Sequence, residues 1–481
     1  MGRKGQGHKS KKTNSNRSKR ELDELVDKLL RLSTTQQNDC TKSLEDVKEI
    51  RFITEQLLNL QQSNTNATTI RSGVVVEEFV KWCGENQAKL EGCQIAEFEG
   101  FDLGLKVCEE IPPASLVISV PRNLFLTVEA AKKTELKRLF DKDQMLRNMH
   151  NVALAMFLIF ERFKSDSFWR PYINMLPSSY TTVLYFTVDE LLELKGSPTF
   201  ETALKQIKSI ARQYAYFHKL FHTSDDPVCV FMREKFTYDV YRWAVSTVMT
   251  RQNTIPSEDG ETTMNALIPL WDICNHTNGQ ITTDYNPEKK RCECLALKQY
   301  QPGEQFFIFY GARTNADLFI HNGFVYEDNI YDGYWMKLGI SKSDPLQEKR
   351  TELLNKLQIN PTGSFFLKKA PLHMDGALLA FVRIFNMNEE QLRHWLDSDR
   401  SDDVQYLECA LDTCLEKKSW SFLQARLKLL LAIYKTTLEE DGKLLEDTGL
   451  GTNRKLAIRM RSTEKSILRS WMDYVDQYIK Q

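Results

Sequence analysis

Two apolar stretches of the chain end in polar, turn-forming residues whose side chains could form one site. Residues 266–271 are apolar, and Asn275 and His276 follow them closely. Further along, residues 306–309 are apolar and are followed by Tyr310 and a glycine. Turn-forming residues stand where a chain leaves the core, so two such ends can be brought to one point. We therefore expect an active site where these two segments meet.

The side chains in and near these segments are neutral or aromatic, apart from two arginines. They are Asn253, Trp271, Asn275, His276, Tyr310, Arg251 and Arg313. The chain has no phosphate loop and no recognisable Ser, His and acid set, and its 8 histidines are dispersed, which argues against a metal centre. The set suits a reaction whose electrophile arrives already activated and which needs alignment and exclusion of water. Methyl transfer from a sulfonium is such a reaction.

Each of these residues also has a structural explanation. Asn275 and His276 could satisfy backbone groups at a strand end, and Arg251 could cap the end of a helix. Trp271 and Tyr310 could be core residues whose polar atoms are paired. For any single residue the structural explanation is favoured. Their joint order along the chain shifts the balance toward a site.

Composition bounds the class of protein. A chain of 481 residues with 42% apolar residues predicts two or three domains, and a net charge of −1 gives no field that favours nucleic acid or a membrane. The longest apolar run, residues 152–160, is too short to span a bilayer. Without a secretory signal, the 10 cysteines are expected as reduced thiols in a cytoplasmic protein. Cys292 and Cys294 are interpreted as neighbours on one face of a strand, rather than as half of a metal site.

The N-terminal region is expected to be a tail followed by helices. Residues 1–20 contain eight Lys and Arg and no acidic residue, which predicts a disordered basic tail. A solvated tail is favoured over a nuclear signal or an RNA contact, although the tail leaves a nuclear location open beside the cytoplasmic one. Apolar spacing over residues 22–32 and 44–60 predicts two amphipathic helices within residues 21–70.

Residues 71–335 are expected to form a mixed domain that positions the two apolar segments. Strands are predicted at 93–98, 103–108 and 116–121, a resumed β region from Leu267, and a hairpin of 280–285 with 291–297. A helical insertion at about 130–250 contains predicted helices at 151–163, 207–222 and 238–250. A polar loop is expected at 257–260.

Beyond Ser343 no strand pattern remains, so residues 336–481 predict an all-α domain. Its predicted helices cover residues 346–357, 376–385, 389–396, 404–415, 422–437 and 456–478.

The order of these motifs resembles the SET-domain methyltransferases. Asn275-His276 after a strand, followed by the segment from Gly303 to Tyr310-Gly311, carries the resemblance. The long insertion and the helical C-terminal region resemble the branch that includes the Rubisco large-subunit methyltransferase. Residues 211–217, 241–253 and 266–279 make the chain most similar to members of that branch that methylate a histidine of actin.

The resemblance implies an α+β fold: a SET-type β core with a pseudoknot and a helical insertion, followed by the all-α domain as a substrate-binding domain. It implies S-adenosyl-L-methionine as cofactor and actin as protein substrate, methylated at the distal (tele) imidazole nitrogen of a histidine. We expect a monomer, with neither nucleic acid nor a membrane as partner. No cysteine cluster follows Tyr310, so a zinc-binding post-SET segment is not expected.

The resemblance also assigns cofactor-binding residues. They are Arg71, Phe101, Asp102, Leu103, Arg251, Asp272, Ile273, Cys274, Asn275, His276, Asn322, Gly323 and Phe324. Arg251 would pair with the cofactor carboxylate, Asn275 would hold the amino-acid end, and Phe324 would stack on the adenine. Many SET domains have glycine where this chain has Asp102, and aspartate tolerates a positive φ better than most residues.

For the acceptor, the resemblance and the chemistry of imidazole lead to a second set. A lysine must lose a proton from a pKa near ~10.4, whereas imidazole, near ~6.5, is mostly neutral at pH 7. Asn253 and Tyr310 are predicted as catalytic residues, with Asn253 accepting the ring N–H so that the other nitrogen presents its lone pair. Substrate contacts are predicted for Trp271, Arg212, Arg313 and Ile281. The alternatives are a protein-lysine methyltransferase of the same branch and a non-catalytic SET interaction module.

Overall fold

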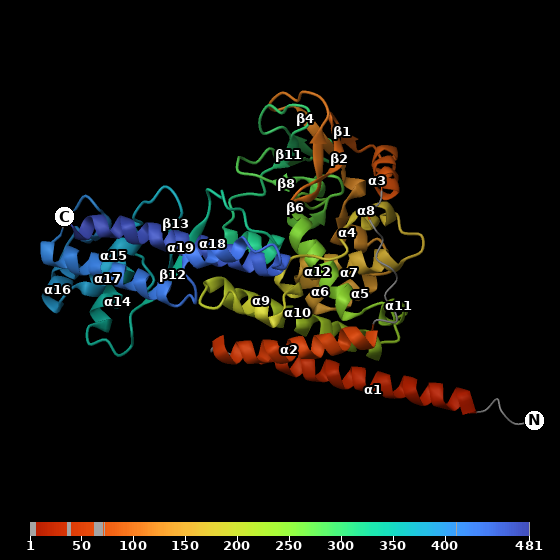
Figure 1. Ribbon diagram of the computed structural model, residues 1–481, viewed down its shortest axis with the longest axis horizontal. Coiled ribbons are helices and arrows are strands. Elements are labelled where there is room, and N and C mark those ends of the chain that lie inside the picture. The colour runs from red at the N-terminus through yellow and green to blue at the C-terminus, as the bar shows by residue number, and fades with distance from the viewer. Residues whose placement is uncertain (1–5, 36–39, 62–70, 72, 410, 481) are drawn as a thin grey trace, which may run out of the picture. The chain divides into compact units, whose positions relative to one another are not determined.

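Figure 1 shows a computed structural model of the chain, which describes residues 6–35, 40–61, 71, 73–409 and 411–480. The chain divides into two compact units. The first unit consists of Met1–Val188, Thr202–Gly311 and Ile320–Gly323, and the second of Asp189–Glu201, Ala312–Phe319 and Phe324–Gln481.

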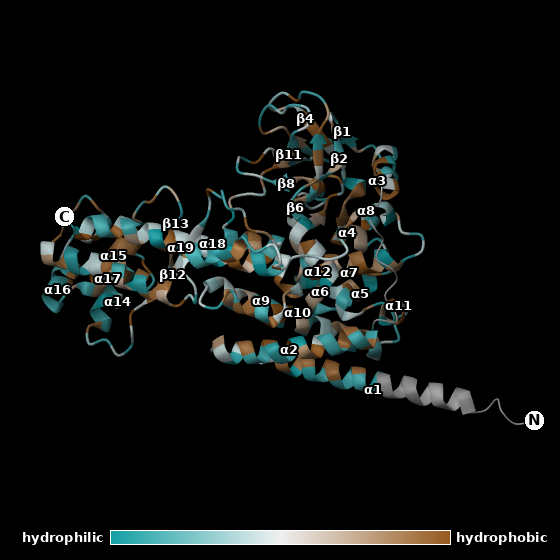
Figure 2. Ribbon diagram, viewed as in Figure 1, coloured by the Kyte–Doolittle hydropathy of each residue, from teal (hydrophilic) through white to brown (hydrophobic). Residues whose placement is uncertain are grey.

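Two long helices open the first unit, α1 (Gln6–Thr34) and α2 (Cys40–Gln61). Figure 2 shows both hydrophobic and hydrophilic residues along α2 and along the coloured part of α1, and Arg51 of α2 donates hydrogen bonds to the carbonyls of Val183 and Leu184. The prediction of a disordered tail was wrong from Gln6 onward; residues 1–5 lie outside the described residues. Residues 8–34 contain neither proline nor glycine. A helix that is held by buried residues near its C-terminal end can therefore continue toward the N-terminus.

The strands of the first unit form three sheets in the described part of the chain. One has the order β1-β4-β10-β9, another β2-β3-β11-β8, and the third β5-β7-β6. Their bounds are β1 (Lys89–Leu90), β2 (Cys93–Phe98), β3 (Asp102–Val107), β4 (Leu116–Pro121), β5 (Leu126–Thr127), β6 (Gln252–Pro256), β7 (Thr263–Leu267), β8 (Asn275–His276), β9 (Thr283–Asn286), β10 (Arg291–Leu295) and β11 (Gln305–Ile308). The predicted hairpin is the antiparallel pair of β9 and β10, and Cys292 and Cys294 are both buried on β10, as expected for one face of a strand.

The insertion between β5 and β6 is helical, as predicted. It contains α4 (Val128–Ala131), α5 (Lys137–Lys142), α6 (Gln144–Asn148), α7 (His150–Phe163), α8 (Arg170–Met175), α9 (Val188–Leu192), α10 (Pro198–Thr223), α11 (Pro227–Arg233) and α12 (Tyr238–Arg251), and α3 (Gly73–Glu85) precedes β1. Helix α7 lies in the core, with residues 152–161 buried, and packs against α12. The Thr237 side chain caps the N-terminus of α12. The helix ends at Arg251, directly before β6.

The apolar residues 266–271 do not form one strand. β7 ends at Leu267, and Leu270 has a φ of 71° while the N–H of Trp271 donates to the carbonyl of Pro269. This is a γ-turn with a positive φ, a rare and strained conformation. Proline cannot continue a ladder, so the chain leaves the sheet there and Trp271 begins the short 3-10 helix η4 (Trp271–Ile273). The β region also starts earlier than predicted, because β6 and β7 form a hairpin around the predicted polar loop at 257–260.

The second unit is built mainly from helices. Besides α9 it contains α13 (Asn315–Asp317), α14 (Gln347–Lys356), α15 (Gly376–Asn386), α16 (Glu389–Asp397), α17 (Thr413–Ala432), α18 (Leu438–Leu445) and α19 (Thr452–Ile479). Its core includes Leu378, Leu423, Leu468 and Trp471, which are all fully buried. The guanidinium of Arg383 is buried there and donates to the carbonyls of Val404, Tyr406 and Cys409.

Two predictions for this region were wrong. The region predicted as all-α contains a two-stranded antiparallel ribbon of β12 (Gly333–Gly339) and β13 (Thr362–Lys368). β13 has the sequence Thr-Gly-Ser-Phe-Phe-Leu-Lys, in which three consecutive apolar residues replace an apolar–polar alternation, and such a short apolar run does not distinguish a strand from a helix. The helix predicted over 404–415 does not form as one element: residues 404 and 405 end a 3-10 turn (η6, Ser401–Gln405), 406–409 are irregular, and 413–415 begin α17. Arg383 binds the carbonyls of Val404, Tyr406 and Cys409, which a helix would use internally.

Candidate active site

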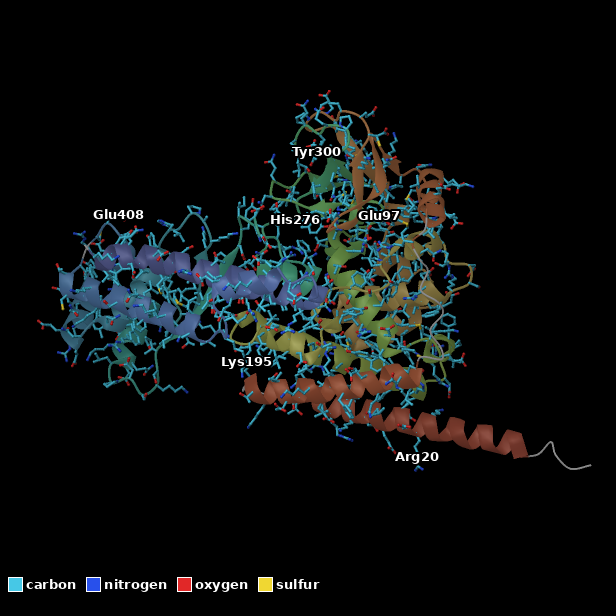
Figure 3. All side chains as sticks on the ribbon, in the orientation of Figure 1. Arg20, Glu97, Lys195, His276, Tyr300 and Glu408 are labelled. Carbon is cyan, nitrogen blue, oxygen red and sulfur yellow. The ribbon has the colours of Figure 1, made fainter. Side chains whose placement is uncertain are left out.

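The two predicted site segments lie side by side in the first unit. β8 pairs in parallel with β11, with Asn275 opposite Phe307 and His276 opposite Ile308. Beyond the strands, the backbone N–H of Tyr310 donates to Nδ1 of His276 at 3.2 Å. The Tyr310 hydroxyl donates to the carbonyl of Cys274 at 2.6 Å. Figure 3 labels His276 where these segments meet.

The Asn275 amide ties this crossing to a third segment. Its Nδ2 donates to the carbonyl of Leu103 on β3 and to Oε1 of Gln305 on β11, both at 3.0 Å. A Cβ placed on Gly104 would lie 3.0 Å from that same Nδ2, so the amide needs a glycine there. The side chain of Asn275 thus joins three strands, and the crossing has one defined register.

Asp102 adopts the backbone conformation that its position requires. Its φ is 65°, as expected for a residue that stands in place of glycine. The side chain of Arg71 forms an ion pair with the Asp102 carboxylate. Phe101 beside it is 46% exposed and makes an edge contact with Phe307. Arg71, Phe101 and Asp102 therefore lie together at the edge of the β3–β11 pair.

A buried ion pair joins the end of α12 to Asp272, which precedes β8. Arg251, at the end of α12, donates from Nη1 to the carbonyl of Asp272 at 2.8 Å, and the same nitrogen lies 3.4 Å from the Asp272 carboxylate. The Tyr172 hydroxyl donates to Oδ2 of Asp272. Among the described residues, no hydrogen-bond donor reaches Oδ1 of Asp272, although that atom is buried.

The ionisation of this group follows from burial and charge. Burial raises the pKa of Asp272 above its usual value, although Arg251 and the Tyr172 hydroxyl act in the opposite direction. Burial disfavours the charge of Arg251, but the pKa of the guanidinium is raised, and the neighbouring Asp272 is the main cause that raises it. Burial and the neighbouring Asp272 raise the pKa of Tyr172 well above its usual value. The tyrosine thus remains a neutral donor, and Arg251 remains a cation.

Asn253 follows Arg251 on β6 and is half-buried. Its Nδ2 donates to the carbonyl of Arg251 at 3.2 Å. Among the described residues, no donor is found for its Oδ1, so the amide oxygen is available as an acceptor. A cavity of about 140 Å³ lies along the last turns of α12, lined by Val245, Val248 and Met249 and by residues of α7 and α10.

Comparison with known proteins places this arrangement in a family. Residues 102–311 match the family model described as SET domain, and residues 341–468 match the one described as Rubisco LSMT substrate-binding. The actin-histidine N-methyltransferase of Gallus gallus is 42% identical over 455 residues, which cover 94% of this chain and 77% of that protein. The Homo sapiens protein of the same name is 41% identical over the same shares.

The chain belongs to the SET-domain family of actin-histidine N-methyltransferases. Solved structures confirm the SET-type α+β fold. A structure of Rubisco LSMT bound to sinefungin and monomethyllysine superposes with a TM-score of 0.68 at 23% identity, covering 84% of this chain and 92% of that one. A structure of Rubisco LSMT bound to AdoMet has a TM-score of 0.65 with the same coverage.

Within this SET-domain chain, other predicted site residues are spread over both units. In the first unit, Asn322 donates to the carbonyl of Thr250, and Gly323 has a φ of 77°. A Cβ on Gly323 would lie 2.9 Å from the Thr181 hydroxyl, which donates to the Gly323 carbonyl. Phe324 belongs to the second unit, so its predicted stacking on adenine stays a prediction.

The predicted substrate residues have different surroundings. Trp271 is buried and Arg212 is exposed on α10, next to residues that line the cavity along α12. Ile281 is 67% exposed, and its predicted contact with the substrate stays a prediction. Arg313 lies in the second unit. The side chains of Asp272, Ile273 and Cys274 are buried, which leaves their backbone atoms for any cofactor contact.

Sequence analysis missed three residues that build the site: Tyr172, Tyr180 and Gly104. Tyr172 contacts Asp272 from a helix 100 positions earlier, and no spacing rule connects such residues. Tyr180 shares a hydrogen bond with Thr247 and lies near Arg251. Gly104 was visible as a glycine inside a predicted strand, which signals a close backbone approach.

In the described part of the chain, no helix is both long and apolar enough to cross a membrane.

We expect Tyr172→Phe to lower the free energy of unfolding by about 1–3 kcal/mol, because it leaves a buried carboxylate without its hydroxyl donor. Chemical denaturation followed by circular dichroism measures the change. Tyr238→Phe is the matched control, since the Tyr238 hydroxyl is buried with no partner among the described residues. Equal effects of the two substitutions would show that Asp272 does not depend on Tyr172.

We expect Gly104→Ala to destabilise the first unit by about 1–3 kcal/mol, because the new methyl group displaces the Asn275 amide and the Phe98 ring. Gly84→Ala, in α3, meets nothing within 4 Å and should be neutral or stabilising. Thermal unfolding of both variants tests the difference. If Gly104→Ala were as stable as the parent, the three-strand role of Asn275 would be wrong.

Proposed function

We propose that this protein transfers a methyl group from S-adenosyl-L-methionine to the distal (tele) ring nitrogen of a histidine in actin. The Asn253 amide is the observation that carries the proposal, because its nitrogen is engaged by a backbone carbonyl and its oxygen is free to accept a ring N–H. The relatives at 41–42% identity are named for actin-histidine N-methylation, which supports the same substrate class here.

The residues of the first unit fit S-adenosyl-L-methionine. Arg251 and Arg71 are cations suited to its carboxylate, and the backbone at Asp102 has the positive φ expected at a position where many SET domains have glycine. The exposed ring of Phe101 offers an apolar face. The resemblance further assigns the amino-acid end to Asn275 and the adenine edge to the backbone of His276. When bound, the cofactor would supply an electrophilic methyl group on a sulfonium.

Asn253 would select the tautomer of the target imidazole. Its Oδ1 would accept the N–H of the proximal ring nitrogen, so that the distal nitrogen presents its lone pair. A neutral amide does this without holding the ring as an imidazolium before transfer. The new bond forms between the distal nitrogen and the methyl carbon, the carbon–sulfur bond breaks, and its electron pair remains on sulfur. The ring becomes cationic and releases its proton to water.

Trp271 and Tyr310 would limit how the ring can turn. The strained γ-turn at Leu270 fixes the start of η4 and with it the buried Trp271. The Tyr310 hydroxyl is held by the carbonyl of Cys274, so its ring is fixed at the crossing. Fixed walls of this kind lower the entropy cost of aligning nitrogen, carbon and sulfur.

The substrate chain would extend along the end of α12. The cavity there has room for a side chain next to the target histidine, and its walls are Val245, Val248 and Met249 with the polar Gln206 and Gln213. Arg212 lies beside it and would contact the substrate segment. We expect this enzyme to act in the cytoplasm, where actin is available, and to act as a monomer.

We expect Asn253→Ala to lower kcat about 10- to 100-fold, the effect of one lost hydrogen bond to the reacting ring. Calorimetry with S-adenosyl-L-methionine should give an unchanged Kd. Asn265→Ala is the matched control, because Asn265 is a half-buried asparagine on the same hairpin that bonds to Gln252. A wild-type rate for Asn253→Ala on actin would remove the tautomer role.

We expect Tyr310→Phe to lower kcat about tenfold, since the ring loses the hydroxyl that holds it to Cys274. Tyr300→Phe is the control: that hydroxyl also donates to a backbone carbonyl, that of Phe307 on β11. Stopped time courses with labelled cofactor measure both. Equal rates for the two variants would reduce Tyr310 to a packing residue.

Mapping the methyl group on actin separates the candidate activities. Mass spectrometry should place it on a histidine, and fragmentation against synthetic standards should give the distal nitrogen. A methylated lysine would instead favour the related lysine methyltransferase. Failure to bind S-adenosyl-L-methionine at all would favour a non-catalytic interaction module.

A further inference from the structure

The β12–β13 ribbon of the second unit has an open edge on β13. Two backbone bonds flank the ribbon: Ile340 N–H to the Pro361 carbonyl, and Lys369 N–H to the Asp332 carbonyl. In the register of the ribbon, which pairs Met336 with Phe365, both flanking bonds join an even-numbered residue on the β12 side to an odd-numbered residue on the β13 side. The odd-numbered residues of β13 therefore form the hydrogen bonds to β12. In an antiparallel pair, the residues between those that bond to the partner strand point their N–H and C=O groups away from that strand. On β13 these are the even-numbered residues.

The outward backbone groups of Ser364 and Phe366 have no hydrogen-bond partner in the described part of the chain. The two ends of the same edge are closed. The Thr362 N–H donates to Oδ1 of Asn360 at 2.9 Å, and the Lys368 carbonyl accepts from the Trp471 indole at 2.8 Å. The open stretch is therefore short and central, and it offers two donors and two acceptors in strand spacing.

An apolar wall stands next to the open stretch. Trp335 lies opposite Phe366 in the ribbon, and the two rings pack with centroids 4.8 Å apart. Trp335 is 49% exposed. Gly333 makes room for the Phe366 ring, since a Cβ there would lie 2.2 Å from its Cζ. A half-exposed tryptophan in a fixed aromatic pair is a strong anchor for an apolar partner side chain.

A cavity of about 410 Å³ connects the edge and the wall. Its lining includes Ser364, Phe366 and Trp335 of the ribbon, His373 and Asp375 beyond it, and the buried Ile359. The volume lies in the range of sites that take a bound side chain or small ligand. The cavity is formed wholly by residues of the second unit.

We propose that this edge binds an extended segment of the protein substrate as a third strand, with one apolar side chain against Trp335 and Phe366. An open strand edge recognises an extended main chain, and the adjacent cavity selects its side chain. The proposal rests on the proposed function for the identity of the occupant. Residues 341–468, which include Ser364 and Asp375, match the model described as Rubisco LSMT substrate-binding, and this favours a substrate segment over other polypeptides. The segment is distinct from the target histidine, so the edge acts as a second binding site.

Ser364→Pro tests the strand edge directly. Its N–H points outward and makes no bond within the ribbon, so proline removes a donor and blocks strand addition at a position where an edge strand tolerates it. Ser364→Ala keeps the N–H and is the matched control. Trp335→Ala removes the apolar wall. Thermal unfolding of each variant checks that the second unit remains folded.

Each variant is assayed with folded actin and with a short peptide that contains only the target histidine and its neighbours. We expect Ser364→Pro and Trp335→Ala to raise KM for actin about tenfold while kcat/KM for the peptide stays at the wild-type value. Ser364→Ala should match the wild type on both substrates. Equal losses on actin and peptide, or no loss on actin, would overturn the proposal.

Two further results would also overturn it. A shift in sedimentation on Trp335→Ala would show that the edge pairs with a second copy of this chain. Retained actin KM in a folded Ser364→Pro variant would show that the open edge is not used. If the wild-type protein methylated neither actin nor the peptide, the proposed function itself would fail, which is a different outcome from a loss confined to actin.

Discussion

The site depends on the pairing of two segments that are distant in the sequence. The ladder between β8 and β11 is only two residues long, which alone would be weak. Side chains and backbone beyond it complete the join: Asn275 bonds across to Leu103 and Gln305, and Tyr310 bonds back to Cys274. Because these are bonds between polar groups in a partly buried place, a shift of register would leave several of them unsatisfied. The same bonds therefore fix both the fold and the positions of the candidate site residues.

The charged pair of Arg251 and Asp272 is buried close to these segments, and its surroundings explain why it is tolerated. Moving Arg251 and Asp272 out of water is costly, and such a pair is acceptable only when further polar groups complete its bonding. The Asp272 carbonyl accepts from Arg251, and Tyr172 donates to the carboxylate. Desolvation keeps that tyrosine protonated, so the donor persists at physiological pH. The orientation of the Arg251 guanidinium is thus set from one side by the protein, and its position follows from where α12 ends.

How much could be read from the sequence differs between elements. β2 has the predicted bounds, because its alternating pattern is bordered by glycines that end it clearly. β13 was missed, since three consecutive apolar residues hide its alternation and its partner β12 is separated from it by the helix α14. Asn275, Asn253 and Tyr310 could be selected because polar residues follow apolar runs there. Tyr172 could not, because its role exists only through a contact across 100 positions, and local patterns carry no such information.

The charges of the site bear on which acceptor it can methylate. A lysine acceptor must first give up a proton, and this needs a group that can take it or a path to water. The Asp272 carboxylate is 1% exposed and engaged by Arg251 and Tyr172, so it is poorly placed to take that proton. Asn253 offers an amide oxygen, which accepts a hydrogen bond but does not remove a proton at neutral pH. We therefore propose that these groups act on an acceptor that is already neutral, and imidazole is the side chain that meets this condition while still holding one N–H to be oriented.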